Sequence, residues 1–264
     1  MRSGWLLALL CGCAAGPAAH VGPVTATTAV GERVFACSQA GVFESVPGGL
    51  RFVADPGVRP FALACRAAFD DEPAILLVGG GSPAQSGEVT LLDLEGHVLA
   101  RRRVADDLVY AVSLAPREPR AAAACADGCV HLLSVPGLVP ERTAWRHGGP
   151  AVAVAFAPDG TLLASAGHDG KILLGAPDGA ASPQALLDHT AAVTCLAWSV
   201  DGHLLASGAR DGKVRLHDRS GRLLHTWLRL GGAITSVALT AGQLEYSVAG
   251  GPGSPSHRAS LALP

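Results

Sequence analysis

The sequence predicts an all-β protein built from a repeated unit of short strands. Residues 146–179 and 188–221 align without a gap, at a constant offset of 42 residues. Within each unit, short apolar runs are separated by Asp-Gly and other turn sequences, which is typical of strands joined by tight turns. The 264 residues also include 33 Gly and 18 Pro, so turns are frequent and long helices are disfavoured. A unit of this length with four strands has the period of a β-propeller blade.

The rest of the chain divides into units of similar length, each with short apolar runs bounded by turn residues. The strands expected in the first three units are 24–30, 33–38, 42–46 and 50–54, then 61–67, 74–78, 88–93 and 97–103, then 108–114, 120–125, 129–135 and 141–145. The last unit has three strands, 234–239, 244–248 and 257–263, so its outer strand is missing. Without the first 20 residues, the chain supplies about 41 residues to each of six units. We therefore expect six blades, with seven as the alternative.

The two aligned units carry the same residue types at matching positions. They are His147, Asp159-Gly160, Ser165 and Asp169-Gly170 in one unit, and His189, Asp201-Gly202, Ser207 and Asp211-Gly212 in the other. With these residues, the units resemble the WD40 repeat family. The resemblance implies a WD40-like propeller over residues 20–264. It also implies structural hydrogen bonds within each blade, linking His147, Ser165 and Asp169 in one and His189, Ser207 and Asp211 in the other. Gly175 and His217 occupy the positions of the family's Trp, so we expect both hydrogen-bond chains to end early.

Motifs that would indicate an enzyme are missing from the sequence. Neither G-x-S-x-G nor H-E-x-x-H occurs. The glycine run in 79–86 precedes a strand and not a helix, which argues against a dinucleotide site and predicts a flexible loop within one blade. A net charge of -2 excludes a strongly basic nucleic-acid surface. We interpret the acidic groups at 70–72 and 106–107 as solvated surface, and we expect no catalytic residue, metal or cofactor.

Seven cysteines are present, at spacings that match no zinc-binding pattern. Four of them lie in apolar runs and are interpreted as small buried hydrophobic residues. Cys125 and Cys129 bracket an Ala-Asp-Gly turn, so a disulfide across this hairpin is an alternative in an oxidising compartment.

The resemblance to WD40 proteins implies a non-catalytic scaffold that binds a protein or peptide. In this architecture, the loops between blades and the turns between the two middle strands of each blade gather on one face, and function in rigid scaffolds concentrates on loops. The candidate partner-binding residues there are Arg59, Asp106, Asp107, Arg146, His168 and Arg210. The alternative is a ligand-binding or enzymatic propeller with a site in the central channel. We expect a monomer and no nucleic-acid partner.

Residues 1–19 have the layout of a secretory signal: one Arg, the apolar run Trp5–Leu10, and then small residues. The sequence around Cys13 also resembles a bacterial lipoprotein signal, which would attach the protein to a membrane through a lipidated Cys13. The alternative is that Trp5–Leu10 is an edge strand that closes the ring. Export or membrane anchoring is therefore favoured over a cytoplasmic location, although buried unpaired cysteines suit a reducing cytosol.

Overall fold

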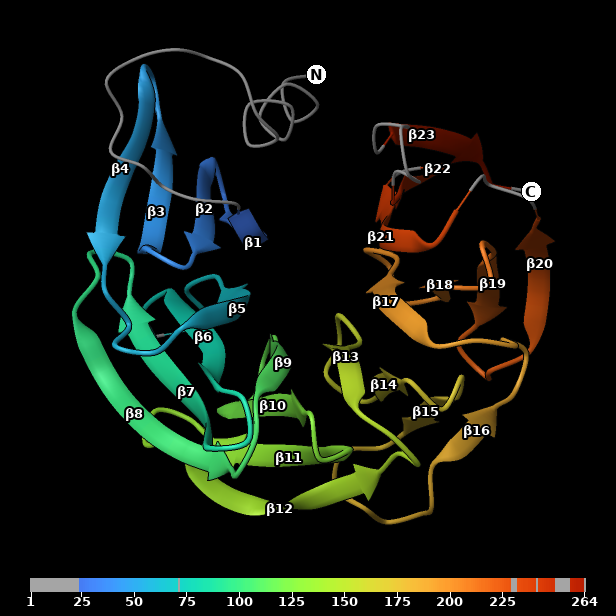
Figure 1. The fold of residues 1–264 in the computed structure, drawn as a ribbon, viewed down its shortest axis with the longest axis horizontal. Helices are drawn as coiled ribbons and strands as arrows, with labels where there is room; N and C mark the ends of the chain where they lie inside the picture. The colour runs from blue at the N-terminus through green and yellow to red at the C-terminus, as the bar shows by residue number, and fades with distance from the viewer. Residues whose placement is uncertain (1–23, 71, 229–231, 241, 250–256, 264) are drawn as a thin grey trace.

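The computed structural model describes residues 24–70, 72–228, 232–240, 242–249 and 257–263. These residues form strands, turns and loops, and they contain no helix. Six antiparallel sheets follow one another around a common centre, each with its first strand innermost (Figure 1). The prediction of a six-bladed all-β propeller is confirmed. The segment 1–19, with Cys13 and the proposed closing strand, lies outside the described residues.

Each blade is a run of consecutive strands. Blade 1 contains β1 (Val24–Val30), β2 (Arg33–Ser38), β3 (Gly41–Val46) and β4 (Gly49–Ala54). Blade 2 contains β5 (Pro60–Arg66), β6 (Ile75–Ser82), β7 (Ser86–Asp93) and β8 (Val98–Ala105). Blade 3 contains β9 (Val109–Leu114), β10 (Arg120–Cys125), β11 (Cys129–Ser134) and β12 (Val139–Arg146). Blade 4 contains β13 (Ala151–Phe156), β14 (Leu163–Gly167), β15 (Ile172–Gly175) and β16 (Gln184–Leu186). Blade 5 contains β17 (Val193–Trp198), β18 (Leu204–Ala209), β19 (Val214–Asp218) and β20 (Leu223–Trp227). Blade 6 contains β21 (Ile234–Thr240), β22 (Gln243–Val248) and β23 (His257–Ala262).

Most predicted strands lie within one or two residues of the observed ones, and blade 6 has the three strands expected of it. The prediction of a flexible loop over 79–86 is wrong. Strand β6 runs through the glycines to Ser82 and pairs with β7 as far as Ser82 opposite Ser86. The physical reason is crowding. A Cβ atom on Gly79 would lie 2.6 Å from Cγ1 of Val112 in the next blade, so glycine is required for packing here and not for loop flexibility.

The core consists of five clusters of buried apolar side chains, one between each pair of consecutive blades. Alternate residues of a strand face opposite neighbours, because successive side chains point to opposite faces of a sheet. In β11, for example, Leu133 packs toward blade 2, whereas Val130 and Leu132 pack toward blade 4. Small residues let the blades approach closely: the four alanines of β10, 121–124, are fully buried. Each cluster thus draws its residues from two consecutive blades, so no blade buries its faces alone.

Blades 1 and 6 stand at the two ends of this series (Figure 1). None of the five clusters joins blade 6 to blade 1 within the described part of the chain. The same part of the chain holds no helix with the length and apolar character of a membrane span.

Candidate functional site

One end of the propeller carries the links between blades and the turns between the second and third strands of each blade. We call this end the loop face. Backbone hydrogen bonds tie a turn to a neighbouring link in several blades: Ala126 N donates to Leu108 O at 2.8 Å, and Arg210 N donates to Ala192 O at 2.9 Å. A loop held at both its ends and its middle keeps its shape, so the loop face is a preorganised surface.

All six residues predicted to bind a partner lie on the loop face. Arg59 is in the link from β4 to β5, Asp106 and Asp107 are in the link from β8 to β9, Arg146 ends β12, His168 is in the turn after β14, and Arg210 is in the turn after β18. Five of them are exposed, and Asp107 is half-buried.

Asp107 is engaged within the chain. Its Oδ1 accepts hydrogen bonds from the backbone N–H of Ala84 at 2.9 Å and of Leu108 at 2.8 Å. These two bonds lower the pKa of the Asp107 carboxyl. The carboxylate thus fixes the hairpin of blade 2 to the link that follows it. Two of the other residues also have partners within the chain: Asp106 pairs with Arg103 at 2.8 Å, and Arg146 donates to Sγ of Cys129 at 3.3 Å.

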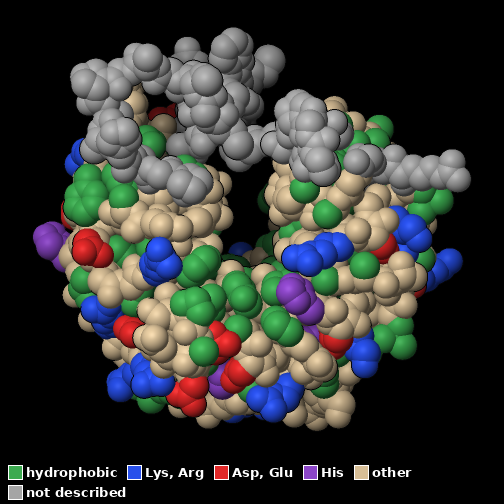
Figure 2. All heavy atoms as spheres, viewed as in Figure 1, with side chains coloured by type: hydrophobic (Ala, Val, Ile, Leu, Met, Phe, Trp, Pro, Cys, Tyr) green, Lys and Arg blue, Asp and Glu red, His purple; other side chains and the backbone are tan. Residues whose placement is uncertain are grey.

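The loop face is divided by charge. Over blades 4 and 5, the turns and links carry Arg146, His168, Lys171, Arg210 and Lys213. Sequence reasoning missed Lys171, although it follows His168 in the same turn and its side chain is exposed. Figure 2 shows one face of the propeller, on which hydrophobic, basic and acidic side chains are intermixed.

A second acidic group follows Asp106 and Asp107 on the loop face, in the turn of blade 3, where Asp127 is exposed. The loop face therefore carries its cations over blades 4 and 5, which we call the basic sector. Two of the acidic groups over blades 2 and 3 are engaged within the chain, because Asp106 pairs with Arg103 and Asp107 accepts two backbone N–H groups.

Behind the basic sector, a chain of hydrogen bonds crosses blade 4. His147 Nδ1 lies 3.1 Å from Oδ1 of Asp169, and its Nε2 lies 2.8 Å from Oγ of Ser165. The expectation that this chain ends early is wrong, because the indole Nε1 of Trp145 donates to the Ser165 hydroxyl at 2.6 Å. Trp145 belongs to β12 of blade 3. Its ring occupies the space beside Gly175, where a Cβ atom would lie 3.5 Å from the indole.

Blade 5 has a different arrangement. His189 Nδ1 lies 3.2 Å from Asp211, and its Nε2 lies 2.9 Å from Oγ of Ser207. Arg215 joins this group: its Nη1 donates to Oδ2 of Asp211 at 3.0 Å and also contacts His189. Burial, followed by the charge of Arg215, lowers the pKa of His189 to about 4, so this imidazole is neutral at pH 7. Both hydrogen-bonded groups include the aspartate of a loop-face turn, Asp169 or Asp211, and so hold these turns in place.

The two serines at the centres of these groups should differ in their effect on stability. Ser165 and Ser207 are both fully buried, but Ser165 bonds to two rings and Ser207 to one. Loss of the Ser165 hydroxyl leaves two buried nitrogens, Nε1 of Trp145 and Nε2 of His147, without this hydrogen-bond partner. Each unpaired nitrogen costs about 1–3 kcal/mol. We therefore expect Ser165→Ala to lower the free energy of unfolding by about 3 kcal/mol and Ser207→Ala by about half as much. Urea denaturation measures both. Equal losses would show that the Trp145 bond contributes nothing.

Cys125 and Cys129 are both free thiols, so the disulfide alternative is not realised. The two residues flank the turn between β10 and β11, and Sγ of Cys129 accepts a hydrogen bond from Nε of Arg146 at 3.3 Å.

Comparison with known proteins supports the repeat assignment. Residues 140–174 and 182–218 match the family model of the WD domain, G-beta repeat. A search of curated proteins found no match. Among solved structures, the chain is similar to a chain of the crystal structure of the mitotic checkpoint complex, with a TM-score of 0.70 at 19% identity over 83% of this chain and 70% of that one. Such a low identity shows the fold alone. The chain is therefore a six-bladed β-propeller in which residues 140–174 and 182–218 match the WD40 repeat model.

Proposed function

We propose that the protein is a non-catalytic scaffold that binds a protein or peptide partner at its loop face. The observation that carries this proposal is the combination of exposed charged residues with loops that are hydrogen-bonded to one another. A preorganised surface loses little conformational entropy when a partner binds. The similar fold of a chain from a multiprotein complex also supports a binding role. The monomeric state and the role of residues 1–19 stay predictions.

The basic sector over blades 4 and 5 is the part of the loop face that we expect to bind an acidic segment of the partner. His168, Lys171 and Arg210 are exposed, whereas the acidic residues beneath them, Asp169 and Asp211, are engaged by His147 and by His189 with Arg215. Because the carboxylates are already paired, the exposed cations on these turns remain available to a carboxylate of the partner.

Reversal of charge in this sector tests the proposal. The immobilised protein would be used to capture partners from an extract of its native cells, beside the double variant Lys171→Glu, Arg210→Glu. Substitution at two exposed residues leaves the fold intact, and like charges that face each other across the interface oppose association by several kcal/mol. We expect the captured protein to fall at least tenfold with the double variant.

The matched control is Arg102→Glu, on the exposed outer strand β8 and away from the loop face. This variant also reverses a charge, but on the outer strand of blade 2, so the amount of captured protein should equal that of the unmodified chain. A partner captured equally by all three proteins would place the binding surface elsewhere and would reject the loop-face proposal.

A further inference from the structure

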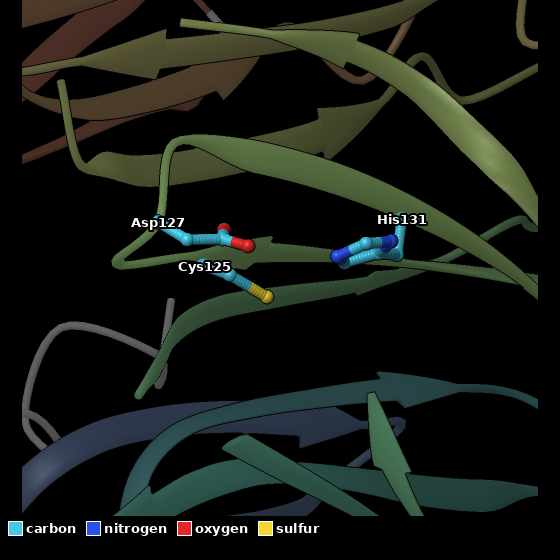
Figure 3. Close-up of side chains that lie close together, drawn as sticks. All are labelled: Cys125, Asp127 and His131. Carbon is cyan, nitrogen blue, oxygen red and sulfur yellow. The ribbon is translucent and has the colours of Figure 1, made fainter. Parts of the chain in front are cut away.

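The turn between β10 and β11 gathers three side chains that sequence spacing did not indicate as a group. Cys125 ends β10, Asp127 lies in the turn, and His131 is in β11 (Figure 3). One potential ligand atom from each residue lies within 4.8 Å of the others. Cys125 and His131 share a sheet face, because alternate residues on paired strands point the same way.

The imidazole of His131 is oriented for coordination. In Figure 3, the tip of its ring points toward Cys125 and Asp127. The nitrogen at this tip, Nε2, is buried and has no hydrogen-bond partner among the described residues. The other nitrogen, Nδ1, lies 3.3 Å from Oγ1 of Thr143. A proton held on Nδ1 by this hydroxyl leaves the lone pair on Nε2, which is the arrangement found in metal-ligating histidines.

A buried nitrogen without a partner costs about 1–3 kcal/mol, so its retention needs an explanation.

The other two potential ligands are the sulfur of Cys125 and the carboxylate of Asp127. The Cys125 side chain is fully buried, and its sulfur makes only a weak contact, at 4.0 Å, with the carbonyl of Ala123. Asp127 uses Oδ1 to accept the backbone N–H of Cys129 at 2.9 Å, which shapes the turn, and it is exposed toward the loop face.

We propose that Cys125, Asp127 and His131 bind one Zn²⁺ ion on the loop face of blade 3. Sulfur and nitrogen donors favour zinc over magnesium or calcium, which prefer oxygen alone. On binding, a Zn–S bond replaces the S–H bond of Cys125, and the proton passes to solvent. Zinc bonds of about 2.0–2.3 Å place tetrahedral ligands roughly 3.5 Å apart, so the three ligand atoms, which lie within 4.8 Å of one another, would approach by up to about 1 Å. The exposed Asp127 permits this movement.

Three protein ligands leave the fourth position of a tetrahedral zinc ion to a water molecule or to a donor group of a docked partner. The proposal does not depend on the scaffold function, because zinc binding is measured on the isolated protein.

The test uses Co²⁺ and Zn²⁺ with the full chain, kept reduced and freed of metal with a chelator. Co²⁺ in place of zinc gives thiolate-to-metal absorption in the near ultraviolet when a cysteine coordinates it. We expect one equivalent of Co²⁺ to produce this absorption and Zn²⁺ to abolish it by displacement. Cys125→Ser should remove the absorption, and Asp127→Asn and His131→Gln should each weaken metal binding at least tenfold.

Two controls assign the signal to this site. Cys37→Ser removes an equally buried thiol from blade 1, and the double variant Cys11→Ser, Cys13→Ser removes the thiols near the N-terminus. Both should retain the absorption. Thr143→Val should weaken binding about 10–100-fold by releasing the orientation of His131. A folded wild-type chain without the absorption, or absorption that persists in Cys125→Ser, would overturn the proposal. Because Asp127 is an exposed turn residue, Asp127→Asn remains informative even where the buried substitutions impair folding.

Discussion

Gly80→Ala is expected to unfold the propeller, or to reduce its free energy of unfolding by more than about 4 kcal/mol. Gly80 lies in β6, opposite Pro60 of β5 and Glu88 of β7. A Cβ atom on Gly80 would overlap the carbonyl oxygen of Arg59 and lie 2.8 Å from its carbon. These are backbone atoms in the link between blades 1 and 2. The clash cannot be relieved by a change of rotamer, and the strand or the link would have to move.

Movement is costly here because the same carbonyl of Arg59 accepts a hydrogen bond from the N–H of Gly81 at 3.1 Å. Displacement of the link would break this bond and disturb the packing of blade 1 against blade 2. Soluble yield and urea denaturation followed by tryptophan fluorescence measure the effect.

Gly149→Ala is the matched control for this substitution. Gly149 also lies on the loop face, but the nearest atom to its added Cβ would be Cβ of His168, at an ordinary 3.6 Å. We expect a change of less than about 1 kcal/mol. Similar stability for the two variants would contradict the crowding that the structure shows at Gly80.

The fold was predictable because its signals are local. Turn residues separate strands along the chain, and the 42-residue offset identifies the blade without any knowledge of contacts between blades. The glycines of β6 were misinterpreted because the same residue type serves loops and crowded strands. Only the positions of Arg59 and Val112, which belong to other strands and links, show that crowding is the cause.

The site could be predicted only for residues that occupy matching positions in the two aligned repeats. His147, Ser165 and Asp169 align with their counterparts in the next blade, so the sequence alone brings them together. Trp145 could not be found in this way, because it reaches Ser165 from the preceding blade instead of from the family position at Gly175. The cluster at Cys125 depends on the register of one hairpin and on the direction of the His131 ring, and neither is encoded in a spacing pattern.

Arg215→Met is expected to lower the free energy of unfolding at pH 7 by about 3–5 kcal/mol. The side chains of Arg215 and Asp211 are 6% and 5% exposed, so this ion pair is shielded from water. Removal of the guanidinium leaves the Asp211 carboxylate buried with only the neutral His189 ring and backbone N–H groups as partners. The control is Arg219→Met in the same blade. Arg219 pairs with Asp159 at 2.6 Å, but both side chains are substantially exposed, so we expect a loss of about 1 kcal/mol or less.

Acid should distinguish this electrostatic role from simple loss of packing. The pKa of His189 in the folded protein is about 4, below its unfolded value of about 6.5, so the unfolded chain binds the proton first as the pH falls. This group therefore destabilises the wild-type protein by about 2 kcal/mol between pH 7 and about pH 5. In Arg215→Met, burial still lowers the His189 pKa, but the contribution of the Arg215 charge is gone, and protonated His189 can pair with Asp211. Stability should then depend less on pH over this range, although it is lower at pH 7. Urea denaturation at both pH values measures the difference, and parallel losses in the two proteins would mean that Arg215 acts through packing alone.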